Sequence, residues 1–199
     1  MSGSMDQRLM GWARAVKRRT RARHPVLWLF TDLSRGVDPL AAAARLPKGL
    51  CGVVFRHDAA PNRAAIGQTL AKICRARRLS LVVAGDIPLA IALGAGVHLR
   101  AGIWPGPQAA ALRRRRIATS SAHTGADIRR ARRAGAQVIF LSPVFPTASH
   151  PGARSLGPVR WSALARISPV FALGGITGRT APALPPACMG AGAIGALGG

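Results

Sequence analysis

Short apolar runs alternate with longer segments of helical character along most of the chain. The runs are rich in Val, Ile, Leu and Phe and are continuously apolar, which is typical of strands that are covered on both faces. Eight such runs lie at residues 26–32, 49–56, 80–86, 96–100, 116–123, 137–145, 169–176 and 192–197. The Ala/Arg-rich segments between them predict helices, most clearly at residues 38–46, 62–78, 126–136 and 159–167.

This eightfold alternation predicts an α/β protein with the architecture of a (β/α)8 TIM barrel. A doubly wound open sheet is the alternative, and the number of runs disfavours it. We expect residues 26–199 to form the barrel as a single domain, preceded by a basic N-terminal extension at residues 1–25. Residues 101–116, which follow the fourth run, are broken by Pro and Gly and predict a poor helix.

The end of the chain departs from the regular pattern. It stops two residues after the eighth run, so the last helix of the barrel is expected to be missing. An uncovered apolar flank would be costly. Either the sequence is truncated at this point, or a partner covers the flank, and the oligomeric state stays open.

Composition narrows the class of protein. A chain of 199 residues with 49% hydrophobic content can bury one large core. No apolar run approaches the roughly 18 residues of a spanning helix, so we expect no membrane partner. The first 25 residues have no apolar signal region, which favours a cytoplasmic location, although their Arg-rich character also suits an organelle transit peptide. Cys51, Cys74 and Cys188 lack the spacing of a zinc site and are expected to be small buried hydrophobes.

The charge of the chain is strongly biased. There are 29 Lys and Arg residues against six acids, all of them Asp, and the basic residues cluster at residues 17–23, 75–78, 113–116 and 129–133. Such a field attracts nucleic acid, phosphorylated metabolites or anionic lipid. No aromatic residue is interleaved in the clusters, which favours a solvated surface over a nucleic-acid groove. Nucleic acid therefore stays a candidate partner but not the favoured one.

Polar residues end the apolar runs. Chemistry in these barrels lies at the carboxyl ends of the strands, so such residues would ring one mouth. They are Asp32, Arg56, Asp86, His98, Arg100, Ser121, His123, Ser142 and Thr147. Any single one is explained by solubility or loop capping, and His98 is best interpreted as a packing or hydrogen-bonding histidine. Glycines at the ends of the seventh and eighth runs predict phosphate binding through exposed backbone N–H groups.

The order of several short motifs resembles the thiamine phosphate synthase and TenI superfamily. LFTD, VVFRHD, GVHL, SSAH, PVFPT and FALGGIT occur in order and with consistent spacing, and the resemblance extends over residues 26–197. It implies a (β/α)8 barrel and phosphorylated pyrimidine and thiazole small molecules as ligands. The synthases join a pyrimidine pyrophosphate to a thiazole phosphate and release pyrophosphate, with Mg²⁺ on two Asp carboxylates. The TenI-type members resemble thiazole tautomerases that move protons without a metal.

The resemblance assigns the pyrimidine pyrophosphate and metal positions only in part. Arg56 matches the family's arginine, whereas Val54 and Asp58 stand where the family has Gln and Lys. Asp58 in place of Lys is expected to repel a phosphate. Asp86 matches a metal-ligating Asp, and the second carboxylate falls near Ile103. One carboxylate is a poor Mg²⁺ site unless the substrate supplies the other oxygens.

The resemblance also implies roles for residues on the other strands. Ser121 would contact the pyrimidine, and His123 matches a histidine shared by both branches that can act as a general base. Pro143 stands where a tautomerase would carry a second histidine. The phosphate-binding positions are Thr147, Ser149, His150 in place of Lys, Gly174, Gly175, Gly195 and Ala196.

Three functions stay open on these residues. The first is a thiamine phosphate synthase-type transferase of thiamine biosynthesis, with activity in doubt because several ligands are replaced. The second is a TenI-like, metal-independent thiazole tautomerase with His123 as base. The third is a non-catalytic barrel that binds a phosphorylated ligand or nucleic acid.

Overall fold

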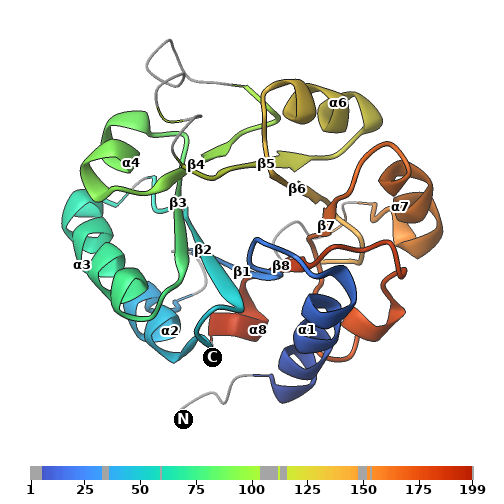
Figure 1. Ribbon diagram of the computed structural model, residues 1–199, viewed down its shortest axis with the longest axis horizontal. Coiled ribbons are helices and arrows are strands. Elements are labelled where there is room, and N and C mark those ends of the chain that lie inside the picture. The colour runs from blue at the N-terminus through green and yellow to red at the C-terminus, as the bar shows by residue number, and fades with distance from the viewer. Residues whose placement is uncertain are drawn as a thin grey trace.

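The computed structural model describes residues 6–32, 36–58, 60–103, 112, 116–147, 152 and 154–198. Its strands form a closed parallel barrel in chain order, as Figure 1 shows. The strands are β1 Leu27–Phe30, β2 Cys51–Phe55, β3 Ser80–Ala84, β4 Gly96–Leu99, β5 Ala118–Ala122, β6 Val138–Leu141, β7 Phe171–Ala172 and β8 Ala191–Ala193. The ring closes where β1 pairs with β8, with Leu27 opposite Ala191. The predicted TIM barrel is therefore confirmed.

Helical segments surround this barrel. They are α1 Gln7–Thr20, α2 Pro39–Arg45, α3 Arg63–Ala76, α4 Ile87–Leu93, α6 Gly125–Arg133, α7 Gly157–Ala165, the 3₁₀ turn η2 Ala181–Ala183 and α8 Gly195–Gly198. The poor helix predicted after the fourth run falls largely on residues 104–111 and 113–115, which lie outside the described residues.

The last two apolar runs contain less strand than expected. The run at 169–176 contributes only the two residues of β7, because the chain leaves the β conformation at Gly174 and Gly175 with φ angles of 94° and 65°. The run at 192–197 divides into β8 and the four-residue helix α8, where Gly198 N–H donates to Ile194 O at 3.1 Å. The eighth helical segment is thus very short.

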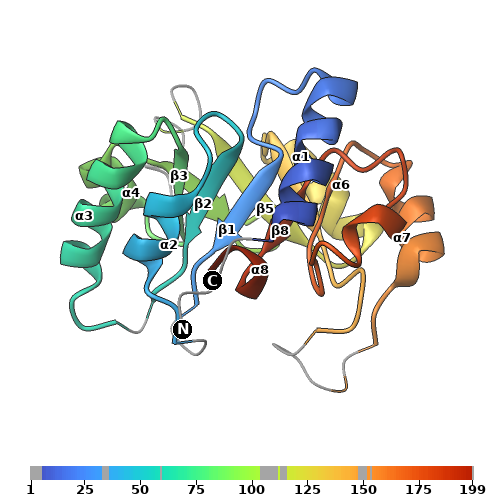
Figure 2. The same cartoon turned by 90° about the horizontal axis from the view of Figure 1, so that it is seen from below.

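The basic N-terminal segment contains a helix that packs on the barrel. Leu9, Met10, Ala13 and Val16 are buried along one stripe of α1, at the spacing of a helix that covers a core. Figure 1 and the side view in Figure 2 place α1 alongside β1 and β8. Arg19 Nη2 donates to Cys188 O at 2.9 Å in the connection before β8. The helix α1 therefore covers the flank beside the short α8, for which the sequence analysis had left a truncation or a covering partner open.

The interior of the barrel is filled by a separate aromatic cluster. Trp28 and Phe30 of β1 meet Phe140 of β6 edge to face, with ring centroids 5.9 and 4.8 Å apart. Gly52 and Gly192 make room for these rings, since a Cβ at either position would lie 2.6 Å from a ring carbon. Because this interior is packed, chemistry is confined to the mouth above it.

Two further predictions concern the cysteines and the membrane. Cys51, Cys74 and Cys188 are buried and free, as expected, and burial raises the pKa of each thiol, to about 12, 12 and 11 respectively. Among the described residues, no helix has both the length and the apolar character needed to cross a bilayer.

The acidic residues gather at the end of the barrel where the strands finish. Asp6, Asp38 and Asp86 cap the N-termini of α1, α2 and α4, and Asp127 lies in the first turn of α6. Asp32 and Asp58 follow β1 and β2. By contrast, the basic cluster at 75–78 lies at the C-terminal end of α3, which faces the opposite end, whereas Arg130 of α6 donates to Ala101 O in the loop after β4. The candidate site therefore carries a mixture of charges rather than a uniformly basic surface.

Candidate functional site

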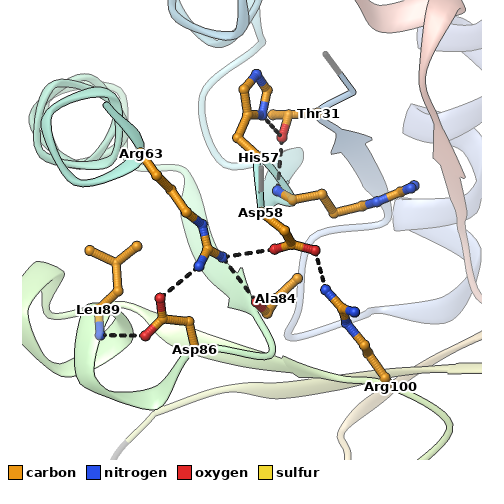
Figure 3. Close-up of polar contacts among 9 residues, drawn as sticks. Thr31, His57, Asp58, Arg63, Ala84, Asp86, Leu89 and Arg100 are labelled. Atoms are coloured by element: carbon orange, nitrogen blue, oxygen red, sulfur yellow. Dashed lines mark hydrogen bonds and ion pairs between the residues drawn. The ribbon is translucent and has the colours of Figure 1, made fainter. Parts of the chain in front are cut away.

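The mouth on the side of β2, β3 and β4 is organised around an arginine that the sequence analysis did not select. Arg63 is the first residue of α3, and its guanidinium lies between Asp58 and Asp86 (Figure 3). Nη2 lies 3.0 Å from Asp58 Oδ1, and Nη1 lies 2.6 Å from Asp86 Oδ2. Nη2 also donates to Ala84 O at 3.0 Å. One cation therefore joins the loop after β2 to the loop after β3.

The environment of Asp58 differs from the one expected. Its Oδ2 is paired with Arg100 Nη2, in addition to the contact of its Oδ1 with Arg63 (Figure 3). Two guanidinium groups thus neutralise the carboxylate that was expected to repel a phosphate. Asp58 is therefore not an isolated negative charge, and its effect on a phosphate stays a prediction. Arg100, whose side chain is 65% exposed, and Arg56, also exposed, present positive charge to the solvent at this side of the mouth.

Asp86, the candidate metal ligand, has both oxygens engaged. Oδ1 accepts from Leu89 N–H at 2.9 Å as the N-cap of α4, and Oδ2 is taken by Arg63. The second carboxylate of the family falls near Ile103, an apolar side chain that is 61% exposed. Among the described residues, no group of three or more His, Cys, Asp or Glu side chains could hold a metal ion. Mg²⁺ requires several oxygen ligands, so this donor set does not fit it.

A buried pair beneath the loop fixes the backbone of Arg56. Thr31 Oγ1 accepts from Arg56 N–H at 2.9 Å and lies 2.9 Å from His57 Nδ1. His57 is 2% exposed and stacks on Phe55 with ring centroids 5.3 Å apart. Burial lowers the pKa of His57 and outweighs the opposing effect of Asp32. A neutral imidazole therefore supports the start of the β2 loop.

His98 of β4 packs in the barrel. It is 5% exposed, its Nδ1 lies 2.8 Å from Thr119 Oγ1, and its ring meets Phe30 edge to face at 5.6 Å. Burial lowers the pKa of His98 to about 3, and the charges of Arg56 and Arg100 act in the same direction. This agrees with the interpretation of His98 as a packing histidine.

The end of β5 positions Ser121 and His123. Ser121 is half-buried, and its Oγ accepts from Ala101 N–H at 3.4 Å. His123 is exposed, with Nδ1 3.0 Å from Ser142 O. A carbonyl only accepts, so Nδ1 carries the proton in the neutral ring and Nε2 keeps its lone pair.

Asp127 holds the start of α6 below His123. Its Oδ2 accepts from the N–H groups of His123 and Thr124, both at 3.0 Å, in a capping box with the Thr124 hydroxyl. Burial acts to raise the pKa of Asp127, but these hydrogen bonds and Arg130 hold it below its ordinary value. The backbone of His123 is therefore anchored to a helix that begins at the mouth.

On the opposite side, the loops after β6 and β7 are joined through their backbones. Val144 N–H donates to Leu173 O at 2.9 Å, and Phe145 N–H donates to Gly174 O at 3.2 Å. A Cβ at Gly174 would lie 2.7 Å from Pro143 Cβ, so only glycine fits this close approach. Within the described part of the chain, no hydrogen bond engages the N–H of Gly174 or Gly175. Phosphate binding at these two glycines stays a prediction.

The structure describes only some of the remaining candidate residues. Thr147 is half-buried at the end of the β6 loop, whereas Ser149 and His150 lie outside the described residues. Gly195 is the exposed first residue of α8 and Ala196 the half-buried second. They follow β8, which pairs with β7 at Ala172 and Ala191, so the two glycine loops leave neighbouring strands.

Sequence reasoning missed Arg63, His57 and Thr31. One signal in the sequence could have identified Arg63, namely its position at the start of a predicted helix. The first residue of a barrel helix lies near the end of the barrel where the strands finish. Thr31 follows the first apolar run, but no pattern indicates that its hydroxyl would reach residues 25 positions later in the chain.

The fold agrees with the comparison to known families. The family described as thiamine monophosphate synthase matches residues 35–195, most of the chain. The chain belongs to this family. The predicted superfamily is thereby confirmed, and the shared region contains the candidate site residues up to Gly195.

Curated relatives of the thiamine monophosphate synthase family point the same way. The thiamine biosynthesis bifunctional protein ThiM/ThiE of Symbiobacterium thermophilum is 36% identical over 184 residues, covering 86% of this chain and 37% of that protein. The putative thiamine-phosphate synthase 2 of Aquifex aeolicus is 30% identical over 163 residues, covering 77% of this chain and 86% of that protein. The chain thus spans little more than a third of the bifunctional relative.

A solved structure of similar architecture carries a related name. The thiamine phosphate pyrophosphorylase from Pyrococcus furiosus superposes with a TM-score of 0.73 at 26% identity, and 87% of each chain is covered. Structural likeness therefore extends over nearly the whole thiamine monophosphate synthase barrel described above.

Proposed function

We propose that this member of the thiamine monophosphate synthase family couples hydroxymethylpyrimidine pyrophosphate to thiazole phosphate and releases pyrophosphate. The observation that supports the proposal is that one mouth carries two groups of residues suited to anions. Exposed Arg56 and Arg100 follow β2 and β4, while the N–H groups of Gly174 and Gly175 follow β7. A reaction between two phosphorylated substrates needs two such features.

The arginine side suits the diphosphate of the pyrimidine substrate. In the proposed step, the bond between the pyrimidine methylene carbon and the diphosphate oxygen breaks, and the oxygen keeps the electron pair. The departing pyrophosphate gains negative charge as this bond lengthens. Arg56 and Arg100 stabilise that charge, because guanidinium groups form strong charge-assisted hydrogen bonds with phosphate oxygens.

The glycine side suits the phosphate of the thiazole substrate. Held there, the thiazole would present its ring nitrogen to the pyrimidine methylene carbon, and the nitrogen lone pair would form the new C–N bond. The ring thereby becomes a thiazolium cation, which balances the negative charge carried away by pyrophosphate. Ser121, at the end of β5 between the two sides, is placed to contact the pyrimidine.

The direct test uses purified protein and both substrates. We expect thiamine phosphate and pyrophosphate to form in equal amounts. Chromatography measures the thiamine phosphate, and an enzyme-coupled assay measures the pyrophosphate. Absence of thiamine phosphate at high protein concentration, both with Mg²⁺ and with EDTA, would reject the proposal.

A second candidate function is supported by the geometry of His123. Its Nδ1 faces Ser142 O, which leaves Nε2 as a proton acceptor at an exposed position. A thiazole tautomerase needs such a base. The tautomerase would exchange a ring-adjacent proton of its thiazole substrate with deuterated water, and His123→Ala would abolish that exchange. Synthase activity that survives in His123→Ala would separate the two functions.

A further inference from the structure

We propose that Arg63 takes the place of the divalent metal in this barrel, so that the site binds diphosphate without Mg²⁺. Its guanidinium holds Asp58 and Asp86 together, and the exposed Arg56 and Arg100 then contact the anion. The identification of that anion as a diphosphate rests on the proposed function. The replacement of the metal by an internal arginine rests on the geometry around Arg63.

The position of the guanidinium is the first support. Arg63 lies between two carboxylates, 3.0 Å from Asp58 and 2.6 Å from Asp86, which is where a bridging cation would lie (Figure 3). Asp86 is the carboxylate that the family resemblance assigns to the metal. In this chain that carboxylate already has a cation at bonding distance.

The second support is the fixed environment of Arg63. Its side chain is only 16% exposed, its Nη2 also donates to Ala84 O, and its guanidinium carbon lies 5.7 Å from the centre of the Phe55 ring. A guanidinium held by two carboxylates, a carbonyl and an aromatic face loses little further freedom when a ligand binds. Arg63 is therefore a built-in cation rather than a mobile surface side chain.

The third support is the balance of charge. Within the cluster, three arginines outnumber the two aspartates by one. Arg63 neutralises much of Asp58 and Asp86, so the excess positive charge appears on the two exposed arginines, where an anion can approach. Without Arg63 the cluster would have no excess charge, and its carboxylates would oppose a diphosphate.

A metal would have to undo this arrangement. To reach Asp86 it would compete with Arg63 at Oδ2 or with the N–H of Leu89 at Oδ1, and to reach Asp58 it would compete with Arg63 or Arg100. It would then lie beside guanidinium groups that repel it. Arg63 thus acts as a positioning residue that fixes the carboxylates and directs positive charge to the mouth.

The first experiment needs no variant. Inorganic pyrophosphate is titrated into the full chain by calorimetry, once with EDTA and once with Mg²⁺, with Mg²⁺-pyrophosphate mixing subtracted as a blank. We expect the two dissociation constants to agree within about twofold. An affinity at least tenfold weaker in EDTA would overturn the inference.

The second experiment removes the internal cation. Arg63→Gln should weaken pyrophosphate binding at least tenfold in EDTA, and Mg²⁺ should restore part of the loss, because the freed Asp58 and Asp86 can then bind the metal. Arg160→Gln, which removes an exposed arginine of α7, is the matched control and should bind as the parent does. Arg63→Gln with unchanged affinity in EDTA would overturn the inference.

A folding control and a comparison of binding with turnover separate the inference from the proposed function. If Arg63→Gln does not fold, as judged by circular dichroism, Arg63→Lys supplies the comparison, since a single ammonium cannot bridge both carboxylates in the same way. Metal-independent pyrophosphate binding without thiamine phosphate formation would uphold the inference and reject the synthase function. Thiamine phosphate formation that EDTA abolishes would uphold the function and overturn the inference.

Discussion

In the proposed function, the two sides of the mouth bind anions by different means. On the side of β2 to β4, charged side chains form the site. Asp58 stands where the family resemblance leads us to expect a Lys, and Arg63 and Arg100 both pair with it. On the side of β6 and β7, the site consists of the backbone N–H groups of Gly174 and Gly175, both of which have positive φ angles. A side-chain site can exchange one charge for another and still attract an anion. A backbone site tolerates little change, because its geometry depends on the absence of a Cβ.

The largest effect should come from a change on the glycine side. Gly174→Ala places a methyl group against Pro143 at a φ of 94° and should lower the free energy of unfolding by about 2–4 kcal/mol. Gly49→Ala is the matched control, since Gly49 also has a positive φ but nothing within 4 Å of its Cβ position, and it should cost about 1–2 kcal/mol. Chemical denaturation measures both, and equal losses would contradict the close approach at Gly174.

The next largest effect is a pH dependence of the unfolding free energy, which arises from His98 in the core below the arginine side. His98 has a pKa of about 3 in the folded protein and about 6.5 when unfolded, so the unfolded chain binds more protons between these values. Stability should therefore fall as the pH decreases from 7 to 5, with His98 contributing a loss of about 2 kcal/mol. The lowered pKa of His57 acts in the same direction.

His98→Gln isolates this contribution. Its unfolding free energy should depend less on pH than that of the parent protein, whatever its absolute stability at pH 7. Urea denaturation at pH 7 and pH 5 gives the comparison. Identical pH dependence in the two proteins would contradict a neutral, buried His98.

A smaller change in binding free energy should distinguish the two sides of the mouth by the ligand that each one binds. Arg100→Gln removes an exposed cation and should weaken pyrophosphate binding about tenfold, while stability changes little because the side chain is 65% exposed. Binding of thiazole phosphate on the glycine side should stay within about twofold of the parent value, as measured by calorimetry. Equal loss of both ligands would show that the two sides do not act separately.

The smallest effect should follow a change outside both sides. Asp127→Asn weakens the capping box of α6 and its pair with Arg130, and should lower stability by about 0.5–1 kcal/mol at pH 7. Neither anion should bind differently, since Asp127 contacts the backbone at His123 and Thr124 and the side chain of Arg130, none of which belongs to the two proposed anion sites. Thermal unfolding and the same calorimetric titrations test both statements.

The fold could be predicted from the sequence, whereas phosphate binding at the glycine pair after β7 stays a prediction. Strands buried on both faces leave continuous apolar runs, and a backbone anion site leaves a glycine pair at the end of such a run. The stripe of α1 was harder to see, because Leu9, Met10, Ala13 and Val16 alternate with basic residues in a segment that looked like a solvated leader.

The arginine side could not be predicted because its chemistry depends on contacts between elements. Arg63 begins α3, Asp86 caps α4, and nothing in their spacing indicates an ion pair 23 residues apart. The same limit applies to Asp58, since the sign of one residue does not describe a site in which two arginines contact it. Motif comparison identified Asp86, but not the cation that Asp86 binds in this chain.

The most direct test of this account is a single-turnover reaction of the purified chain with both substrates in excess EDTA. The account predicts that thiamine phosphate forms at a rate within about twofold of the rate with Mg²⁺, and that Arg63→Gln slows the reaction in EDTA more than in Mg²⁺. A parent protein that forms thiamine phosphate only when Mg²⁺ is present would contradict the central claim that an internal arginine has replaced the metal.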